Sequence, residues 1–144
     1  MRIETEYYQK LKKKIIQRSA FRRFIRGQAT PIKIREWIGL NHGEVKILLE
    51  SRMKDSMTWG NYGSFWVIDH IVPFWLFDMD NESEMKLLWH PDNLMPMKWK
   101  HNNHKQGDLS FSIRKLSRVK GYSFAVEQLI DRAQKALSVM DEYL

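Results

Sequence analysis

Three short stretches decide the fold that the sequence predicts: Trp66-Val67-Ile68-Asp69-His70-Ile71-Val72-Pro73, Asn93-Leu94-Met95-Pro96-Met97 and Asn102-Asn103-His104-Lys105. The first predicts a strand, because Phe65 to Ile68 is a β-branched and aromatic run and Pro73 cannot donate to a sheet ladder. Asp69 and His70 therefore fall at a strand end. Adjacent side chains on a strand point to opposite faces, so one of the two could hold a metal ion while the other handles a proton.

The second stretch predicts a return strand from Leu94 to Met97. Pro96 within it favours a sheet edge, where a missing N–H is tolerated. Asn93 stands at the entry of this strand and can hydrogen-bond loop backbone. We therefore expect Asn93 to pin the turn that carries His70.

The third stretch belongs to the run from Trp99 to Gln106, which contains no helix breaker before Gly107. This run predicts a short helix that ends at a glycine C-cap. Asn102 and Lys105 are three residues apart and therefore share one face of that helix.

A strand, a return strand and a helix that carry Asp-His, Asn and Asn-x-x-Lys in this order resemble the HNH nucleases, whose core is the ββα-metal fold. The resemblance to a phage and prophage branch of that family covers roughly residues 36 to 108, and includes Met57-Thr58-Trp59-Gly60-Asn61-Tyr62-Gly63 before the site. It implies an α+β protein with a ββα-metal (HNH) core and flanking N-terminal and C-terminal helices.

The chain departs from the pattern of that branch in three places. Ser56 stands where glycine is usual, and Val67 stands where a histidine is frequent. One extra residue in the third stretch leaves Asn102 or Asn103 open as the family's third residue, and Asn102, Asn103 or His104 open as the second metal ligand. The Asn-x-x-Lys spacing favours Asn102.

The resemblance implies a metal-dependent HNH endonuclease that hydrolyses DNA phosphodiester bonds, by nicking or by double-strand cleavage. His70 would be the general base, since a neutral imidazole with an unperturbed pKa near ~6.5 can take a proton from water. Asn93 would orient the His70 loop, and Lys105 would touch a phosphate. Asp69 and Asn102 would hold one Mg²⁺ or Mn²⁺, the ions that oxygen ligands favour over zinc.

A basic DNA-binding protein that keeps the HNH fold without cutting is the alternative. The intact set of Asp69, His70, Asn93 and Asn102 argues against it, because binding alone requires none of these residues. The sequence leaves open the target sequence, the oligomeric state and a role in homing, restriction or genome packaging.

The chain has 144 residues, a formal net charge of +7 and no cysteine. This length suits one domain, in which we expect a basic N-terminal helical region at 1–58, the HNH nuclease core at 59–108, and a C-terminal basic link with an amphipathic helix at 109–144. The lack of cysteine excludes disulfides and four-cysteine zinc ribbons. No run reaches the ~20 apolar residues of a membrane span, so we expect no membrane partner and a cytoplasmic location, in the bacterial host if a phage encodes the protein.

The positive charge is concentrated near the N-terminus. The run from Gln9 to Arg26 contains no acidic residue and eight basic ones: Lys10, Lys12, Lys13, Lys14, Arg18, Arg22, Arg23 and Arg26. Helical spacing leaves one apolar stripe in this basic surface. Because an unrelieved cationic run repels itself, we expect contacts to the phosphates of double-stranded DNA from Lys10, Lys13, Lys14, Arg18, Arg22, Arg23 and Arg26. A solvated face and a membrane-surface helix are the alternatives.

Two short helices are expected after the basic run. Thr30-Pro31 predicts a helix start that continues to Ile38, and Gly39 then turns the chain. Asn41 and Glu44 form a capping-box signal for the second helix. The pair predicts a packed αα-hairpin, with a DNA-reading helix-turn-helix as the less favoured alternative.

The acidic turn from Asp78 to Glu82 precedes a short helix expected near Glu84 to Trp89. Four carboxylates lie close together here, those of Asp78, Asp80, Glu82 and Glu84. They predict a solvated helix N-terminus and not a cation site, because the stretch lacks the central glycine and the closing glutamate of a calcium loop. A zinc site at His90, His101 and His104 is also disfavoured, since no cysteine completes the ligand set.

The last predicted element is a helix from about Phe124, after the basic link from Arg114 to Lys120. Its apolar residues recur mostly at three- and four-residue steps: Val126, Leu129, Ile130, Ala133, Leu137, Met140 and Leu144. We expect this face to pack against the domain, and a homodimer through the same helix is the alternative.

Overall fold

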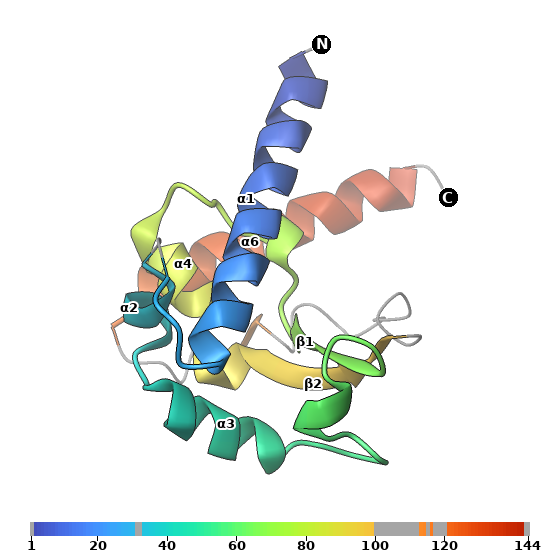
Figure 1. The fold of residues 1–144 in the computed structure, drawn as a ribbon. Coiled ribbons are helices and arrows are strands. Elements are labelled where there is room, and N and C mark those ends of the chain that lie inside the picture. The colour runs from blue at the N-terminus through green and yellow to red at the C-terminus, as the bar shows by residue number, and fades with distance from the viewer. Residues whose placement is uncertain (1, 31–32, 100–112, 115, 117–120, 143–144) are drawn as a thin grey trace.

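Helices and one small sheet make up the computed structural model of the chain, which describes residues 2–30, 33–99, 113–114, 116 and 121–142. Strands β1 (Trp66–His70) and β2 (Leu94–Lys98) form a two-stranded antiparallel sheet. The helices around it are α1 (Arg2–Ile25), α2 (Ile34–Ile38), α3 (His42–Glu50), α4 (Glu82–Leu88) and α6 (Ser123–Glu142) (Figure 1). Short 3₁₀ turns are η1 (Trp59–Asn61), η2 (Phe74–Leu76) and η3 (Pro91–Asn93). The predicted α+β class is confirmed.

The β1–β2 ladder confirms the predicted strand and return strand. It runs in register from the Trp66–Lys98 pair to the His70–Leu94 pair. Asp69 and His70 are consequently the last two residues of β1, as expected. The third predicted piece, a helix at 99–106, lies outside the described residues beyond position 99.

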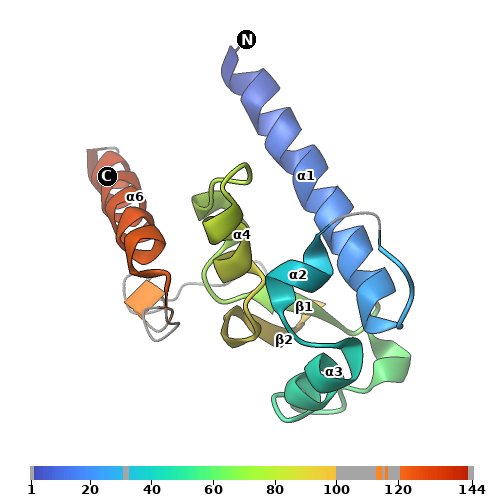
Figure 2. The same cartoon turned by 90° about the vertical axis from the view of Figure 1, so that its left-hand side faces the viewer.

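The C-terminal half of α1 belongs to the hydrophobic core. Four of its apolar residues are at most 3% exposed: Ala20, Phe21, Phe24 and Ile25. This half packs on α2 and α3, whereas the N-terminal half projects beyond the body of the molecule, with Tyr7 and Tyr8 exposed (Figure 2). The chain leaves α1 through Gly27, whose φ of 75° is a left-handed conformation that glycine adopts without strain.

The predicted start of α2 is wrong. The helix begins at Ile34 and not at Thr30-Pro31, and its N-cap residue Lys33 makes no side-chain cap bond. Burial of its apolar residues in the core stabilises this short helix instead of a cap. The glycine turn after α2 and the Asn41–Glu44 capping box of α3 are as predicted. Helix α2 packs on α1 and α4, and α3 packs on α1 and β2, so both helices are part of the packed domain. The αα-hairpin and the helix-turn-helix both stay predictions.

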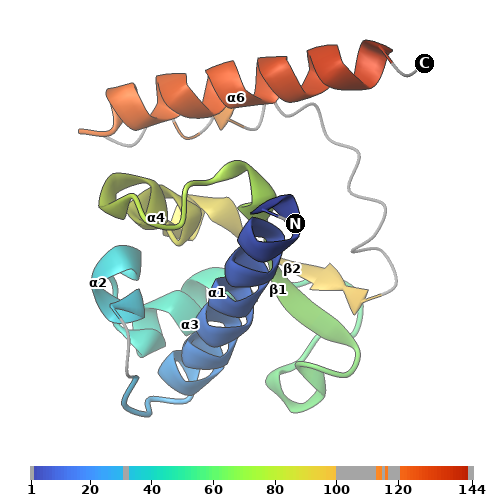
Figure 3. The same ribbon diagram turned by 90° about the horizontal axis from the view of Figure 1, so that it is seen from above.

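Helix α6 packs against the domain, on the side of α4 that faces away from α2 (Figure 3). Its inner face contributes Val126, Leu129 and Ala133, which are at most 3% exposed. The expected packing is therefore confirmed for these three residues, whereas the side chains of Leu137, Met140 and Leu144 lie outside the described part of the chain. None of the described helices combines the length and the apolar character that crossing a membrane requires.

The expectation that the acidic turn forms a solvated helix N-terminus is wrong for Glu84, which is 0% exposed. Arg132 of α6 donates to both carboxylate oxygens of Glu84, with 2.7 Å between Nη2 and Oε2. The backbone N–H of Asp78 also donates to Glu84, and the Asn81 side chain caps α4. The sequence did not reveal this pair because Arg132 lies 48 residues further along the chain.

Candidate active site

Asp69 and His70 end β1 in a buried setting, with exposed fractions of 8% and 6%. The Asp69 carboxylate accepts a hydrogen bond from the backbone N–H of His70 at 2.8 Å. Their side chains point to opposite faces of a strand, yet both are covered, because helices and loops pack around the whole sheet. The strand end thus holds a carboxylate and an imidazole next to each other, away from bulk water.

The His70 ring is fixed by two contacts. Its Nδ1 lies 2.8 Å from the carbonyl oxygen of Leu88, and its ring makes a T-shaped contact with the Trp89 ring at a centroid distance of 4.6 Å. A carbonyl oxygen can only accept, so Nδ1 carries the proton of the neutral ring. The lone pair of neutral His70 is therefore on Nε2, the arrangement that a general base needs.

Asn93 is 0% exposed and holds the turn after β1. Its side-chain oxygen accepts from the backbone N–H of Val72 at 2.7 Å, and its Nδ2 donates to the carbonyls of Leu88 and Val72 at 3.0 and 3.3 Å. Its own carbonyl accepts from the backbone N–H of Ile71 at 2.9 Å. The prediction that Asn93 pins the turn carrying His70 is confirmed.

A cavity of about 100 Å³ adjoins His70. Its walls come from α1, the sheet and the loops beside them, and consist of Arg18, Phe21, Arg22, Tyr62, Val67, Ile68, His70, Trp89 and Trp99. Sequence reasoning selected Arg18, Arg22 and His70, and missed the aromatic walls. No local pattern in the sequence signals those aromatic residues, since they come together only when α1 packs across the sheet.

The loop at 57–63 delivers Tyr62 to this cavity. Asn61 closes the loop, because its side-chain oxygen accepts from the backbone N–H of Thr58 and its Nδ2 donates to the Ser56 carbonyl, both at 2.8 Å. Tyr62 then bridges to Trp66, with ring centroids 4.9 Å apart. Ser56 has a φ of 68°, a left-handed conformation that favours glycine.

Lys14 brings a further charge close to the strand end. Burial lowers the pKa of the Lys14 ammonium and repulsion from Arg18 lowers it further, while attraction to the Asp69 carboxylate raises it. The same ammonium lies 5.0 Å from the centroid of the Phe74 ring. One face of α1 therefore places cations within electrostatic reach of Asp69 as well as of His70.

The other basic residues of α1 fall into two groups. Lys10 donates to the carbonyl of Trp75, and Lys13 pairs with Asp80, so these two attach α1 to the segment between β1 and α4. Arg23 and Arg26 are exposed. The basic residues of α1 that are expected to contact phosphates therefore differ in their surroundings, and only some of them lie near the candidate site.

The predicted metal ligands are described only in part. Asp69 is at the strand end, whereas Asn102 lies outside the described residues, as do Asn103, His104 and Lys105. Within the part of the chain that is described, no three His, Cys, Asp or Glu side chains form a metal-ligand group. His90 caps η3 by accepting from the backbone N–H of Asp92 at 3.1 Å, and burial lowers the pKa of its imidazole, which keeps it in the neutral form that can accept.

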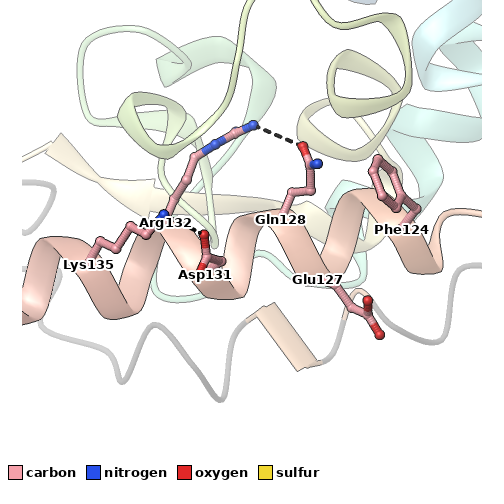
Figure 4. A pocket seen from close by; sticks show the side chains of 6 residues that line it. All are labelled: Phe124, Glu127, Gln128, Asp131, Arg132 and Lys135. Carbon is pink, nitrogen blue, oxygen red and sulfur yellow. Dashed lines mark hydrogen bonds and ion pairs between the residues drawn. The ribbon is translucent and has the colours of Figure 1, made fainter.

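A second concavity, of about 350 Å³, lies along α6. Figure 4 shows its lining residues Phe124, Glu127, Gln128, Asp131, Arg132 and Lys135. Lys135 pairs with Asp131 at 3.0 Å, and Arg132 also donates to Gln128 at 3.4 Å (Figure 4). These cations already have carboxylate or amide partners, so the cavity beside His70 is the better candidate for chemistry.

Comparison with known proteins finds relatives without a described activity. The chain is 29% identical over 93 residues to an uncharacterized protein of Acanthamoeba polyphaga mimivirus, a match that covers 65% of this chain and 40% of the relative. It is 33% identical over 63 residues to a second uncharacterized protein of the same virus, covering 44% of this chain and 28% of that relative. The chain thus spans less than half the length of these curated relatives. No family model matches it, and no solved structure matches it significantly.

Proposed function

We propose that the protein is a metal-dependent endonuclease of the HNH type, which hydrolyses phosphodiester bonds of double-stranded DNA with a ββα-metal core. The observation that carries the proposal is the strand end itself. There, Asp69 stands beside a histidine whose Nδ1 proton is held by the Leu88 carbonyl, and Asn93 holds both that carbonyl and the following turn. A cavity with two arginines adjoins the same histidine.

In this proposal, Nε2 of neutral His70 takes a proton from the water whose oxygen attacks phosphorus. The Leu88 carbonyl keeps the other ring proton in place and stabilises the imidazolium that forms, because the Nδ1–H donates to it more strongly once the ring is charged. Asn93 holds the turn after β1 and thereby keeps the His70 ring in its orientation, so it is a positioning residue.

The oxygen donors of Asp69 and Asn102 suit Mg²⁺ or Mn²⁺ as one divalent ion per site. When bound, such an ion supplies positive charge that offsets the negative charge developing on the phosphate oxygens. The buried carboxylate of Asp69 fits this role, since its position beside His70 puts a ligand next to the base.

The alternative is a DNA-binding protein that does not cut. The exposed cations of α1, including Arg23 and Arg26, favour it, because they suit phosphate contacts without chemistry. A cleavage experiment separates the two functions.

The experiment incubates supercoiled plasmid with the protein in Mg²⁺, in Mn²⁺ and in EDTA, and compares His70→Ala with His90→Asn. We expect the wild type to cut only with metal. His70→Ala should lose about 10²- to 10⁴-fold in rate. His90→Asn, which replaces a histidine outside the cavity and can keep the η3 cap, is the matched control and should cut at the wild-type rate.

Two further measurements check the assignment. Asp69→Asn should weaken Mn²⁺ binding in calorimetry while its circular dichroism spectrum stays that of the wild type. Cleavage by His70→Ala at the wild-type rate would remove His70 from the mechanism. Wild-type protein that binds duplex DNA but leaves it intact with every divalent ion would support the non-cutting alternative.

A further inference from the structure

Arg18 and Arg22 occupy successive turns of α1 and both line the cavity that contains His70. Residues four apart on a helix share one face, so the two guanidinium groups approach the same space. Burial raises the pKa of the Tyr62 hydroxyl and interaction with Arg22 lowers it, so this guanidinium lies beside Tyr62 at the cavity wall. Helix α1, which the sequence predicts to contact DNA phosphates in general, therefore contributes two residues directly to the candidate site.

The charge of this cavity is uncompensated among the residues that line it. None of the described lining residues is acidic, and none of the ion pairs between described residues includes Arg18 or Arg22. Two cations beside one small space repel each other unless an anion joins them. A guanidinium presents a rigid fork of N–H donors that matches phosphate oxygens, so the missing anion is best supplied by a phosphate group.

Aromatic and aliphatic side chains form much of the remaining wall of the cavity. Trp89 stacks on Phe21 with ring centroids 5.2 Å apart, and its Nε1 donates to the buried Gln17 at 2.7 Å. Apolar walls strengthen an attraction between charges that they enclose, because they exclude water. The volume of about 100 Å³ exceeds the roughly 10–15 Å³ that one water molecule requires, so a phosphate group has room.

From this geometry we infer that Arg18 and Arg22 bind the phosphate group on which His70 acts, with Tyr62 positioning Arg22. Arg18 is half-buried and Arg22 is exposed, but both line the cavity. They thereby differ from the cations outside the cavity, which can only attract DNA in general. The identity of this phosphate as the one that is cleaved rests on the proposed function, whereas phosphate binding beside His70 rests on the cavity alone.

The first test compares two double variants that remove the same charge. Arg18→Gln/Arg22→Gln changes the cavity, and Lys12→Gln/Arg35→Gln changes two exposed cations outside it. Each variant should lower the salt dependence of duplex binding by at most about two units, because each loses two cations. Only the cavity variant should also lose saturated cleavage rate, by about 10²-fold or more, as expected when preorganised donors to the reacting group are removed. Equal saturated rates in the two variants would overturn the inference.

The second test works without cleavage. Inorganic phosphate is added in EDTA, and the His70 ring signals are followed by NMR. We expect a saturable shift in the wild type and in Lys12→Gln/Arg35→Gln, a weaker affinity in Tyr62→Phe, and no shift in Arg18→Gln/Arg22→Gln. Arg18→Lys/Arg22→Lys keeps the charge but loses the planar set of guanidinium donors, so it should bind phosphate more weakly than the wild type. This variant keeps the inference testable if the glutamine variant does not fold.

The two tests distinguish failure of the proposed function from failure of the inference about Arg18 and Arg22. If the wild type does not cut DNA but the phosphate shift depends on the arginine pair, the proposed function is wrong and the phosphate site stands. If the wild type cuts DNA and the phosphate shift is the same with and without the arginine pair, the proposed function stands and this inference is wrong.

Discussion

The carbonyl oxygen of Leu88 accepts two hydrogen bonds at the candidate site, one from His70 Nδ1 and one from Asn93 Nδ2. A carbonyl has two lone pairs, so both of its acceptor positions are used. The orientation of the histidine ring and the placement of the asparagine amide are thereby coupled through one backbone atom at the end of α4. A substitution of Asn93 should consequently affect both the stability of the protein and the orientation of the His70 ring.

Asn93→Ala tests this coupling. The substitution leaves the buried N–H of Val72 and the carbonyl of Val72 without the amide, so we expect the free energy of unfolding in urea to fall by about 2–4 kcal/mol. Asp92→Ala is the control, because its exposed carboxylate lies 3.8 Å from Arg52, and it should cost less than about 1 kcal/mol. A loss below about 0.5 kcal/mol in Asn93→Ala, the usual limit for surface substitutions, would contradict the coupling.

At the scale of elements, the helices are attached to the rest of the fold by contacts that their own sequences do not predict. Helix α1 carries a core half and a projecting half, although basic residues run through both. After α3, Arg52 donates to the carbonyls of Pro91 and Leu94 at 2.6 and 2.7 Å and so ties that segment to the start of β2. Helix α6 is attached through the Arg132–Glu84 pair as well as through its apolar face.

Arg132→Met tests how much this pair stabilises α6. It leaves the Glu84 carboxylate buried without its guanidinium, so we expect a loss of about 2–3 kcal/mol, below the value for fully buried pairs because the Arg132 side chain is 34% exposed. Adding Glu84→Leu should restore much of the loss, since no buried charge remains. Lys135→Met, which breaks the exposed pair with Asp131 on the same helix, is the control and should cost less than about 0.5 kcal/mol in the same urea titration. Equal losses in the two single variants would contradict a special role for the buried pair.

At the scale of the whole molecule, the core joins residues from both ends of the chain. Phe21 and Phe24 near the N-terminus and Leu129 near the C-terminus belong to one buried cluster with residues of α4 and β2. The N-terminal helical region at 1–58, the nuclease core at 59–108 and the C-terminal region at 109–144 remain predictions as divisions of the sequence. In the described residues their side chains share one core.

Two deletions test the shared core. Removal of residues 2–8 takes away only the projecting start of α1, so we expect cooperative thermal unfolding and unchanged duplex binding within about twofold. Removal of residues 2–26 also deletes Phe21, Phe24 and Ile25. Each buried phenylalanine is worth about 3–5 kcal/mol and a domain has only about 5–15 kcal/mol of stability, so this variant should show no cooperative transition in circular dichroism. A cooperative transition in the longer deletion would mean that α1 is a separate appendage.

The sequence by itself determined the elements whose causes are local. The β-branched run before Asp69, the return strand with Pro96, the Asn41–Glu44 cap and the periodic apolar residues of the last helix all form as predicted, because neighbouring residues supply the hydrogen bonds or the apolar face. The start of α2 was missed, because burial of Ile34 and not a local cap decides where that helix begins.

Tertiary structure alone decided which distant groups surround His70. The Leu88 carbonyl lies 18 residues away, and Arg18 and Arg22 come from α1, which is separated from β1 along the chain by α2, α3 and η1. The buried Glu84–Arg132 pair spans 48 residues in the same way. Propensity and spacing act over one or two turns of chain, whereas these contacts depend on how α1, α4 and α6 pack around the sheet, and packing is settled by the sum of many weak apolar contacts across the whole core.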